Sequence, residues 1–151
     1  MVMFHRNAPD SVNDAVDMTV LSGLQDAQAE GEPDLIVELI DLYLDDTPRR
    51  LDAMTALLEN RDMLSLRRAA HSLKGSSATL GAGRTAQLCE AIEELTQDNS
   101  LDAFAELLHR LELEFARVRQ SFLIERRRRT SQALGLPANP SPNPRTNTKC
   151  W

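Results

Sequence analysis

His71 is the residue of this chain whose neighbours are best suited to support a chemical reaction at its side chain. Arg67 lies four residues before it, while Lys74 and Gly75 lie three and four residues after it. Residues three or four positions apart share one face of an α-helix. On a helix, the imidazole would therefore have two cations and one residue without a side chain beside it.

These neighbours suit the transfer of a phosphoryl group. A neutral imidazole nitrogen can attack phosphorus, and adjacent cations disfavour a further positive charge on the ring. The same cations would neutralise a phosphoryl group once it is attached. Glycine inside a helix costs about 1 kcal/mol relative to alanine, so Gly75 indicates that another surface must approach closely there. Taken alone, these residues fit a phosphoryl acceptor and an ordinary solvated helix face equally well.

A small apolar patch is predicted on the same face. Helical spacing places Leu64, Ala78 and Ala82 near His71, where they offer a contact surface for a partner protein. Apolar burial there would supply affinity, while Arg67 and Lys74 at its edge would orient an acidic partner. We therefore predict that a partner docks around His71 through a contact of modest area.

The elements that hold this face are predicted to be all-α, forming an antiparallel four-helix bundle with a short accessory N-terminal helix. Apolar residues repeat at helical spacing, and no segment alternates as a strand does. The predicted helices span residues 19–29, 33–60, 62–80, 84–97 and from 101 onwards. Pro48 interrupts the second without shifting its apolar phase, which predicts one long helix kinked there. In the third helix, His71 falls on the solvent side.

Composition divides the chain into three parts. We predict a flexible arm over residues 1–16, the bundle over 17–129, and a disordered basic tail rich in Pro and Asn over 130–151. Residues 126–151 hold six of the 17 basic residues and none of the 23 acidic ones, so the preceding part has a net charge of −12. Because phosphates would be repelled, nucleic acid is not expected as the main partner.

Several other classes of function are not expected. The longest apolar runs are far shorter than the roughly 20 residues of a membrane span, and the first seven residues contain no apolar signal segment, so a cytoplasmic location is expected. Cys89 and Cys150 form no CxxC pair, which argues against a metal site. No phosphate-binding glycine loop is visible. We therefore expect no ATP site and no cofactor in this chain.

Residues 70–82, AHSLKGSSATLGA, resemble the signature of histidine-containing phosphotransfer (HPt) domains. The flanking segments 44–48 and 88–93 also resemble this family, and the resemblance covers about residues 17–119. It implies that His71 accepts a phosphoryl group from the aspartyl phosphate of a receiver domain and passes it to another receiver aspartate. It also implies that Lys74 and Gly75 lie beside the phosphate, with Arg67 in support.

The resemblance further implies the partners, which are receiver domains of a hybrid histidine kinase, of a response regulator or of both. The receiver would supply the aspartyl phosphate and its Mg²⁺, so this chain would be a phosphoryl carrier and not an enzyme. Some family members place a glutamine near the phosphate from the following helix, where this chain has Glu93. A carboxylate at that position would repel phosphate.

Two other functions are compatible with the sequence. The first is a non-catalytic helical adaptor that binds a receiver domain or another helical partner, from which phosphotransfer to His71 would distinguish a carrier. The second is nucleic-acid binding through the arginine run 126–129. That function would require a strongly salt-dependent affinity that is lost when residues 126–151 are deleted.

Overall fold

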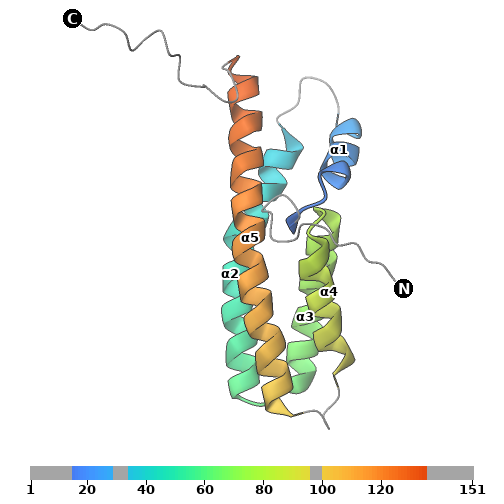
Figure 1. Cartoon of the computed structure of the whole chain (residues 1–151), viewed down its shortest axis with the longest axis vertical. Coiled ribbons are helices and arrows are strands. Elements are labelled where there is room, and N and C mark those ends of the chain that lie inside the picture. The colour runs from blue at the N-terminus through green and yellow to red at the C-terminus, as the bar shows by residue number, and fades with distance from the viewer. Residues whose placement is uncertain (1–14, 29–33, 96–99, 136–151) are drawn as a thin grey trace, which may run out of the picture.

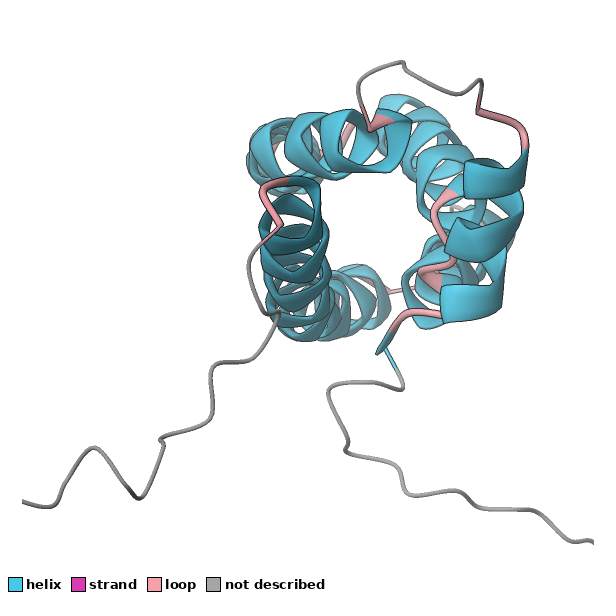
Figure 2. Cartoon of the chain, turned by 90° about the horizontal axis from the view of Figure 1, so that it is seen from above, coloured by secondary structure: helices cyan, strands magenta, loops and turns pink. Residues whose placement is uncertain are grey.

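The computed structural model describes residues 15–28, 34–95 and 100–135. These residues form five helices and no strand: α1 (Met18–Asp26), α2 (Leu35–Glu59), α3 (Met63–Thr79), α4 (Gly83–Glu94) and α5 (Leu101–Ala133). Successive long helices run in opposite directions (Figure 1). Helices α2 to α5 each pack against the next and α5 packs against α2, which closes a ring of four (Figure 2). The predicted four-helix bundle with an accessory N-terminal helix is confirmed.

Polar residues begin four of the five described helices, and a glycine follows the end of α3. The side chains of Asp17, Asp34, Asp62 and Ser100 each accept a hydrogen bond from a backbone N–H in the first turn of the helix that follows. Gly81 follows α3 with φ +83°, a conformation that favours glycine. The N–H of Ala82 then bonds to the carbonyl of Ser77 at 2.8 Å. This hydrogen bond ends α3 at Thr79, one turn after Gly75.

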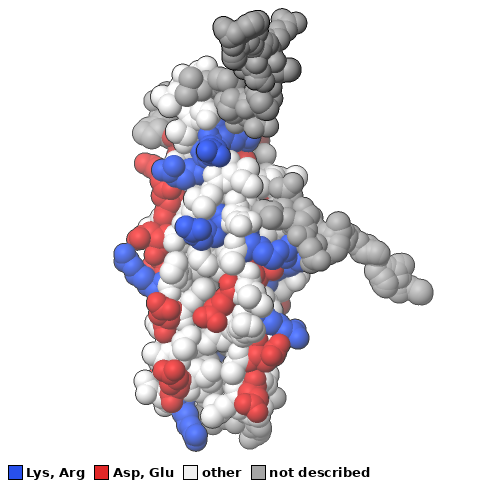
Figure 3. All heavy atoms as spheres, turned by 60° about the vertical axis from the view of Figure 1, so that its left-hand side comes forward, with Lys and Arg blue, Asp and Glu red and all other residues white. Residues whose placement is uncertain are grey.

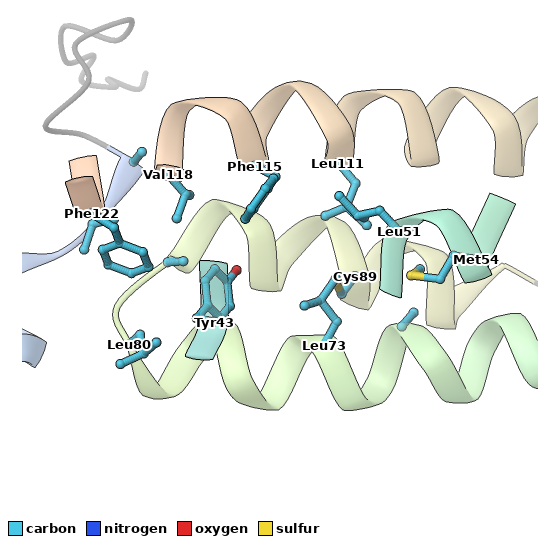
Figure 4. Packing of buried hydrophobic residues seen from close by; sticks show 14 of the residues in the cluster. Tyr43, Leu51, Met54, Leu73, Leu80, Cys89, Leu111, Phe115, Val118 and Phe122 are labelled. Carbon is cyan, nitrogen blue, oxygen red and sulfur yellow. The ribbon is translucent and has the colours of Figure 1, made fainter. Parts of the chain in front are cut away.

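The interior of the bundle is apolar except for a few polar groups. Tyr43 is 4% exposed, and its hydroxyl lies 2.7 Å from the hydroxyl of Ser77. Its ring meets that of Phe122 edge to face at a centroid distance of 5.5 Å. Figure 4 shows how side chains from all four long helices meet here. This core orients α3, because Leu73 and Ser77 can only be buried when His71 faces outwards.

Buried acidic groups predict a loss of stability at high pH. Burial raises the pKa of Tyr43 to about 12 and that of Cys89 to about 12, from ordinary values near 10 and 9. Because the unfolded chain then releases protons first, the free energy of unfolding should fall as the pH rises through this window. In Tyr43→Phe, the fall between pH 10 and 12 should be smaller by about 2–3 kcal/mol. Urea unfolding followed by circular dichroism measures both slopes, and equal slopes would contradict the prediction.

The ends of the bundle differ from the predicted domain boundaries. Ala15 and Val16, which were assigned to the flexible arm, are 1% and 3% exposed and belong to the core. The N–H of Asp17 bonds to the carbonyl of Gly81 at 2.8 Å, which holds this segment against the turn between α3 and α4. Residues 1–14 lie outside the described residues, so the rest of the predicted arm is not tested.

At the other end, α5 continues four residues past the predicted boundary at 129. Arg129 is 7% exposed, and its guanidinium pairs with Glu125 at 2.6 Å and with Asp34 at 3.4 Å. These contacts hold the end of α5 against the start of α2, and the chain leaves the helix at Gly135, which has φ +75°. The remainder of the predicted tail, from 136 onwards, lies outside the described residues.

The arginine run 126–129 is largely paired with acids. Arg126 reaches Asp41 of α2, while Arg128 joins Arg129 in contacting Glu125. Acidic and basic side chains are interspersed on the face shown in Figure 3. Three of the four cations that nucleic-acid binding would need are therefore engaged within the bundle.

Candidate functional site

His71 lies on the outer face of α3 with 69% of its side chain exposed. Leu66, Ala70 and Leu73 of the same helix are buried, so the rotation of α3 about its axis is that predicted from the apolar pattern. Asp62 caps the start of this helix by accepting a hydrogen bond from the N–H of Ser65 at 3.1 Å. The imidazole is thus an accessible group on a rigid support.

Glu93 of α4 is the closest charged neighbour of the imidazole. Its Oε2 lies 2.7 Å from Nδ1 of His71, and 22% of its side chain is exposed. This is the carboxylate that the resemblance placed near the phosphate. Its direct contact with the histidine crosses from one helix to the next, and helical spacing within α3 gives no sign of it.

The two predicted cations are beside His71, but both are engaged by Glu93. Lys74 Nζ lies 2.7 Å from Glu93 Oε1 and 3.9 Å from Glu90 Oε1. Arg67 Nε donates to the backbone carbonyl of Glu93 at 3.1 Å. The hydrogen bond to Glu93 raises the pKa of Lys74, and the same bond lowers the pKa of the Glu93 carboxyl. Both groups therefore stay charged around neutral pH, and the Lys74 ammonium already faces an internal anion.

A third cation, the guanidinium of Arg50, approaches from α2 and was not predicted from the sequence. Arg50 Nη1 donates to the hydroxyl of Ser72, the residue after His71, at 2.6 Å. The guanidinium also pairs with Asp46, one turn earlier in α2. The spacing of Asp46 and Arg50 is visible in the sequence as an i,i+4 pair, but its contact with α3 depends on how the helices pack.

Gly75 lies in open space one turn after His71. Outside the local backbone of α3, a Cβ built on Gly75 would have no heavy atom within 4 Å. Nothing within the described fold therefore requires a glycine at this position, and the clearance it provides faces outwards. This agrees with the predicted approach of another surface.

Two of the three predicted docking residues lie on the exposed surface and one does not. Leu64 is 56% exposed, and Ala78 is also exposed. Ala82 is fully buried, so its assignment to a docking surface is wrong. The helical spacing used to place it stops applying after Thr79, because the left-handed turn at Gly81 redirects the chain. Gly81 itself was the sequence signal for that ending.

The described residues contain neither a metal-binding cluster nor a membrane-spanning helix. Within residues 15–28, 34–95 and 100–135, no three His, Cys, Asp or Glu side chains are grouped so that they could hold a metal ion. No helix in these ranges combines the length and the apolar character needed to cross a bilayer.

Comparisons with known proteins agree with this geometry. A family model described as "Hpt domain" matches residues 38–121. Histidine-containing phosphotransfer protein 5 of Arabidopsis thaliana is 29% identical over 97 residues, covering 62% of each chain. Phosphorelay protein LuxU of Vibrio harveyi is 28% identical over 78 residues, covering 52% of this chain and 68% of LuxU.

A solved structure is similar over most of the bundle. Histidine-containing phosphotransfer protein B (HptB) from Pseudomonas aeruginosa PAO1 is 35% identical, with a TM-score of 0.68, and the match covers 76% of this chain and 96% of HptB. The chain spans 62% of the length of the first two curated relatives it matches.

Proposed function

Because the chain belongs to the Hpt domain family, we propose that it carries phosphoryl groups between receiver domains in a two-component phosphorelay. The observation that supports this most directly is the exposed imidazole of His71, held on a rigid helix with Lys74, Arg67 and an open Gly75 beside it. In this proposal the protein is a carrier that acts in the cytoplasm. It has no ATP site or cofactor of its own, and Mg²⁺ is held by the receiver.

The proposed transfer needs little from the carrier beyond a nucleophile and its surroundings. A nitrogen of His71 attacks the phosphorus of the aspartyl phosphate, the N–P bond forms, and the aspartate oxygen leaves with its electron pair. The reverse step delivers the group to a second receiver. Cations near the imidazole offset part of the charge of the phosphoryl group, and Gly75 leaves room for the acidic pocket of the receiver.

The direct test is incubation of the full chain with a receiver domain carrying ³²P-labelled aspartyl phosphate. We expect label on this chain that is lost in acid and retained in alkali, as a phosphohistidine requires. Binding of the receiver without transfer of label would instead support the helical adaptor. Label that appears with ATP alone, without a receiver, would contradict the absence of an ATP site.

Leu64→Glu should weaken receiver binding about tenfold without unfolding the bundle. The leucine is 56% exposed beside the site, so a charge there removes apolar contact area and repels an acidic partner. Leu113→Glu on α5 is a matched control, because Leu113 is 57% exposed and lies on a different helix. Calorimetric titration with the receiver measures both affinities. An equal loss of affinity in the two variants would contradict the proposed docking face.

Gly75→Gln should slow transfer about tenfold or more, because a side chain one turn from His71 separates the reacting atoms. Gly75→Ala should stabilise the fold by up to ~1 kcal/mol, since the helix favours alanine and the added Cβ meets nothing. Gly23→Gln in α1 has equally open surroundings and should transfer at the normal rate. Rapid-quench measurement of labelled protein gives the rates. Normal transfer by Gly75→Gln would show that no surface approaches there.

A further inference from the structure

We propose that the groove between α4 and α5 is a second binding surface, which takes an acidic amphipathic helix of a partner protein while His71 stays accessible. The inference goes beyond the proposed function and does not depend on phosphoryl transfer, since it concerns residues outside the site around His71. Such a surface lets the protein be held by one partner while it exchanges phosphoryl groups with another.

The groove has a volume of about 500 Å³ and is open to solvent. It lies between two helices that pack side by side (Figure 1). Its lining includes three arginines, two leucines and one glutamate: Arg84 and Leu88 from α4, and Arg110, Leu113, Glu114 and Arg117 from α5. The α5 residues span about two helical turns, or about 10 Å. A site for a small molecule encloses most of the ligand surface, so an open groove of this length fits a surface-bound helix better.

The charge of the lining favours an acidic partner, although the whole chain has a net charge of −6. Arg84 forms no ion pair within the described part of the chain. Arg110 pairs only with Glu106, one turn earlier in α5, and both side chains are exposed. Exposed pairs of this kind contribute little to stability, so a carboxylate of the partner can compete for the guanidinium.

Glu114 holds Arg117 in the wall of the groove and keeps one acceptor unused. Its Oε1 accepts a hydrogen bond from Arg117 Nη1 at 3.0 Å, and the residue is 8% exposed. Its Oε2 is buried and has no hydrogen-bond partner among the described residues. Buried acceptors in folded proteins are normally satisfied. A small movement of this side chain on binding would let a donor of the bound helix complete the site.

Leu88 and Leu113 supply the apolar part of the groove. Leu113 is 57% exposed, whereas Leu88 is half-buried and packs against the core. A bound amphipathic helix can place apolar side chains over the two leucines and acidic ones over the arginines. Apolar burial then provides affinity, and the charge pairs set the orientation of the helix.

The groove and the site around His71 use different sides of α4. Glu93 contacts His71 of α3, whereas Leu88 lines the groove beside α5. Because these two positions are five residues apart, they are rotated by about 140° around the helix axis. A helix in the groove therefore leaves the imidazole uncovered.

The first test uses a synthetic peptide of about 15 residues, with leucines at helical spacing and glutamates elsewhere. Amide shifts of the ¹⁵N-labelled full chain should change around Leu88 and Leu113 and stay unchanged around His71. Replacing the glutamates of the peptide with glutamines should weaken binding about tenfold or more. Shifts centred on His71, or no binding at about 1 mM peptide, would overturn the inference. Tighter binding of phosphatidylserine vesicles or inorganic pyrophosphate than of the peptide would also overturn it.

The second test compares variants by calorimetric titration with the peptide. Arg84→Ala should weaken binding about three- to tenfold, and Leu113→Glu by more than about tenfold, because it adds a repelling charge. Arg119→Ala is the matched control, since Arg119 is exposed on α5 two positions after Arg117 and therefore faces another way. It should bind the peptide with unchanged affinity, and an equal loss in all three variants would overturn the inference.

The third test asks whether the two surfaces work independently. The full chain saturated with the peptide should accept label from a phosphorylated receiver at its normal rate. A block of transfer by the peptide would overturn the claim of a separate surface. Failure to accept label with and without the peptide would instead refute the proposed function, while the shift changes around Leu88 and Leu113 still decide whether the groove binds the acidic helix.

Discussion

His71→Gln is expected to abolish phosphoryl acceptance while the bundle stays folded. In the proposed function the imidazole of His71 is the nucleophile, and a carboxamide cannot replace it. With 69% of the side chain exposed, little packing is lost, and the free energy of unfolding should change by no more than about 0.5 kcal/mol. The decisive measurement is acid-labile label on the variant after incubation with a phosphorylated receiver.

His109→Gln is the matched control for this experiment. His109 is the other histidine among the described residues, and it is exposed on α5. The His109→Gln variant should accept label at the wild-type rate. A loss of label in both variants would therefore indicate a general effect on the protein. Label that persists on His71→Gln would show that another residue is the acceptor.

Gly81→Ala should destabilise the protein by about 3 kcal/mol. Gly81 has φ +83°, and a Cβ added there would lie 2.6 Å from the carbonyl oxygen of Asp17. Either the turn after α3 or the segment that carries Asp17 must move, and both cover the core. Chemical denaturation should therefore show a clear decrease in midpoint, together with loss of the bond from the Asp17 N–H to Gly81.

The same substitution at Gly75 makes this a paired test. Gly75 lies inside a helix, and outside the local helix backbone nothing is within 4 Å of the added Cβ, so Gly75→Ala should change stability in the opposite direction. If both variants were destabilised equally, the distinction between a glycine required by the fold and one that provides clearance for a partner would be wrong.

Helical periodicity alone was enough to predict the class of fold and the outward direction of His71. The spacing of apolar residues in α3 records which side must be buried, and burial of Leu73 fixes the opposite side towards solvent. The helix ends were also predictable to within a few residues, because Asp17, Asp62 and Gly81 act locally through their own side chains or backbone.

Features that join separate helices required the tertiary structure. The apolar pattern of one helix contains no record of which charges on its neighbour it will meet, so the engagement of Lys74 and Arg67 by Glu93 became visible only when α3 and α4 were packed together. Ala82 was misplaced because a single left-handed residue ends the helical spacing on which its placement relied. The accessible histidine thus follows from the order of residues along α3, whereas its charge environment is decided by the contact between α3 and α4.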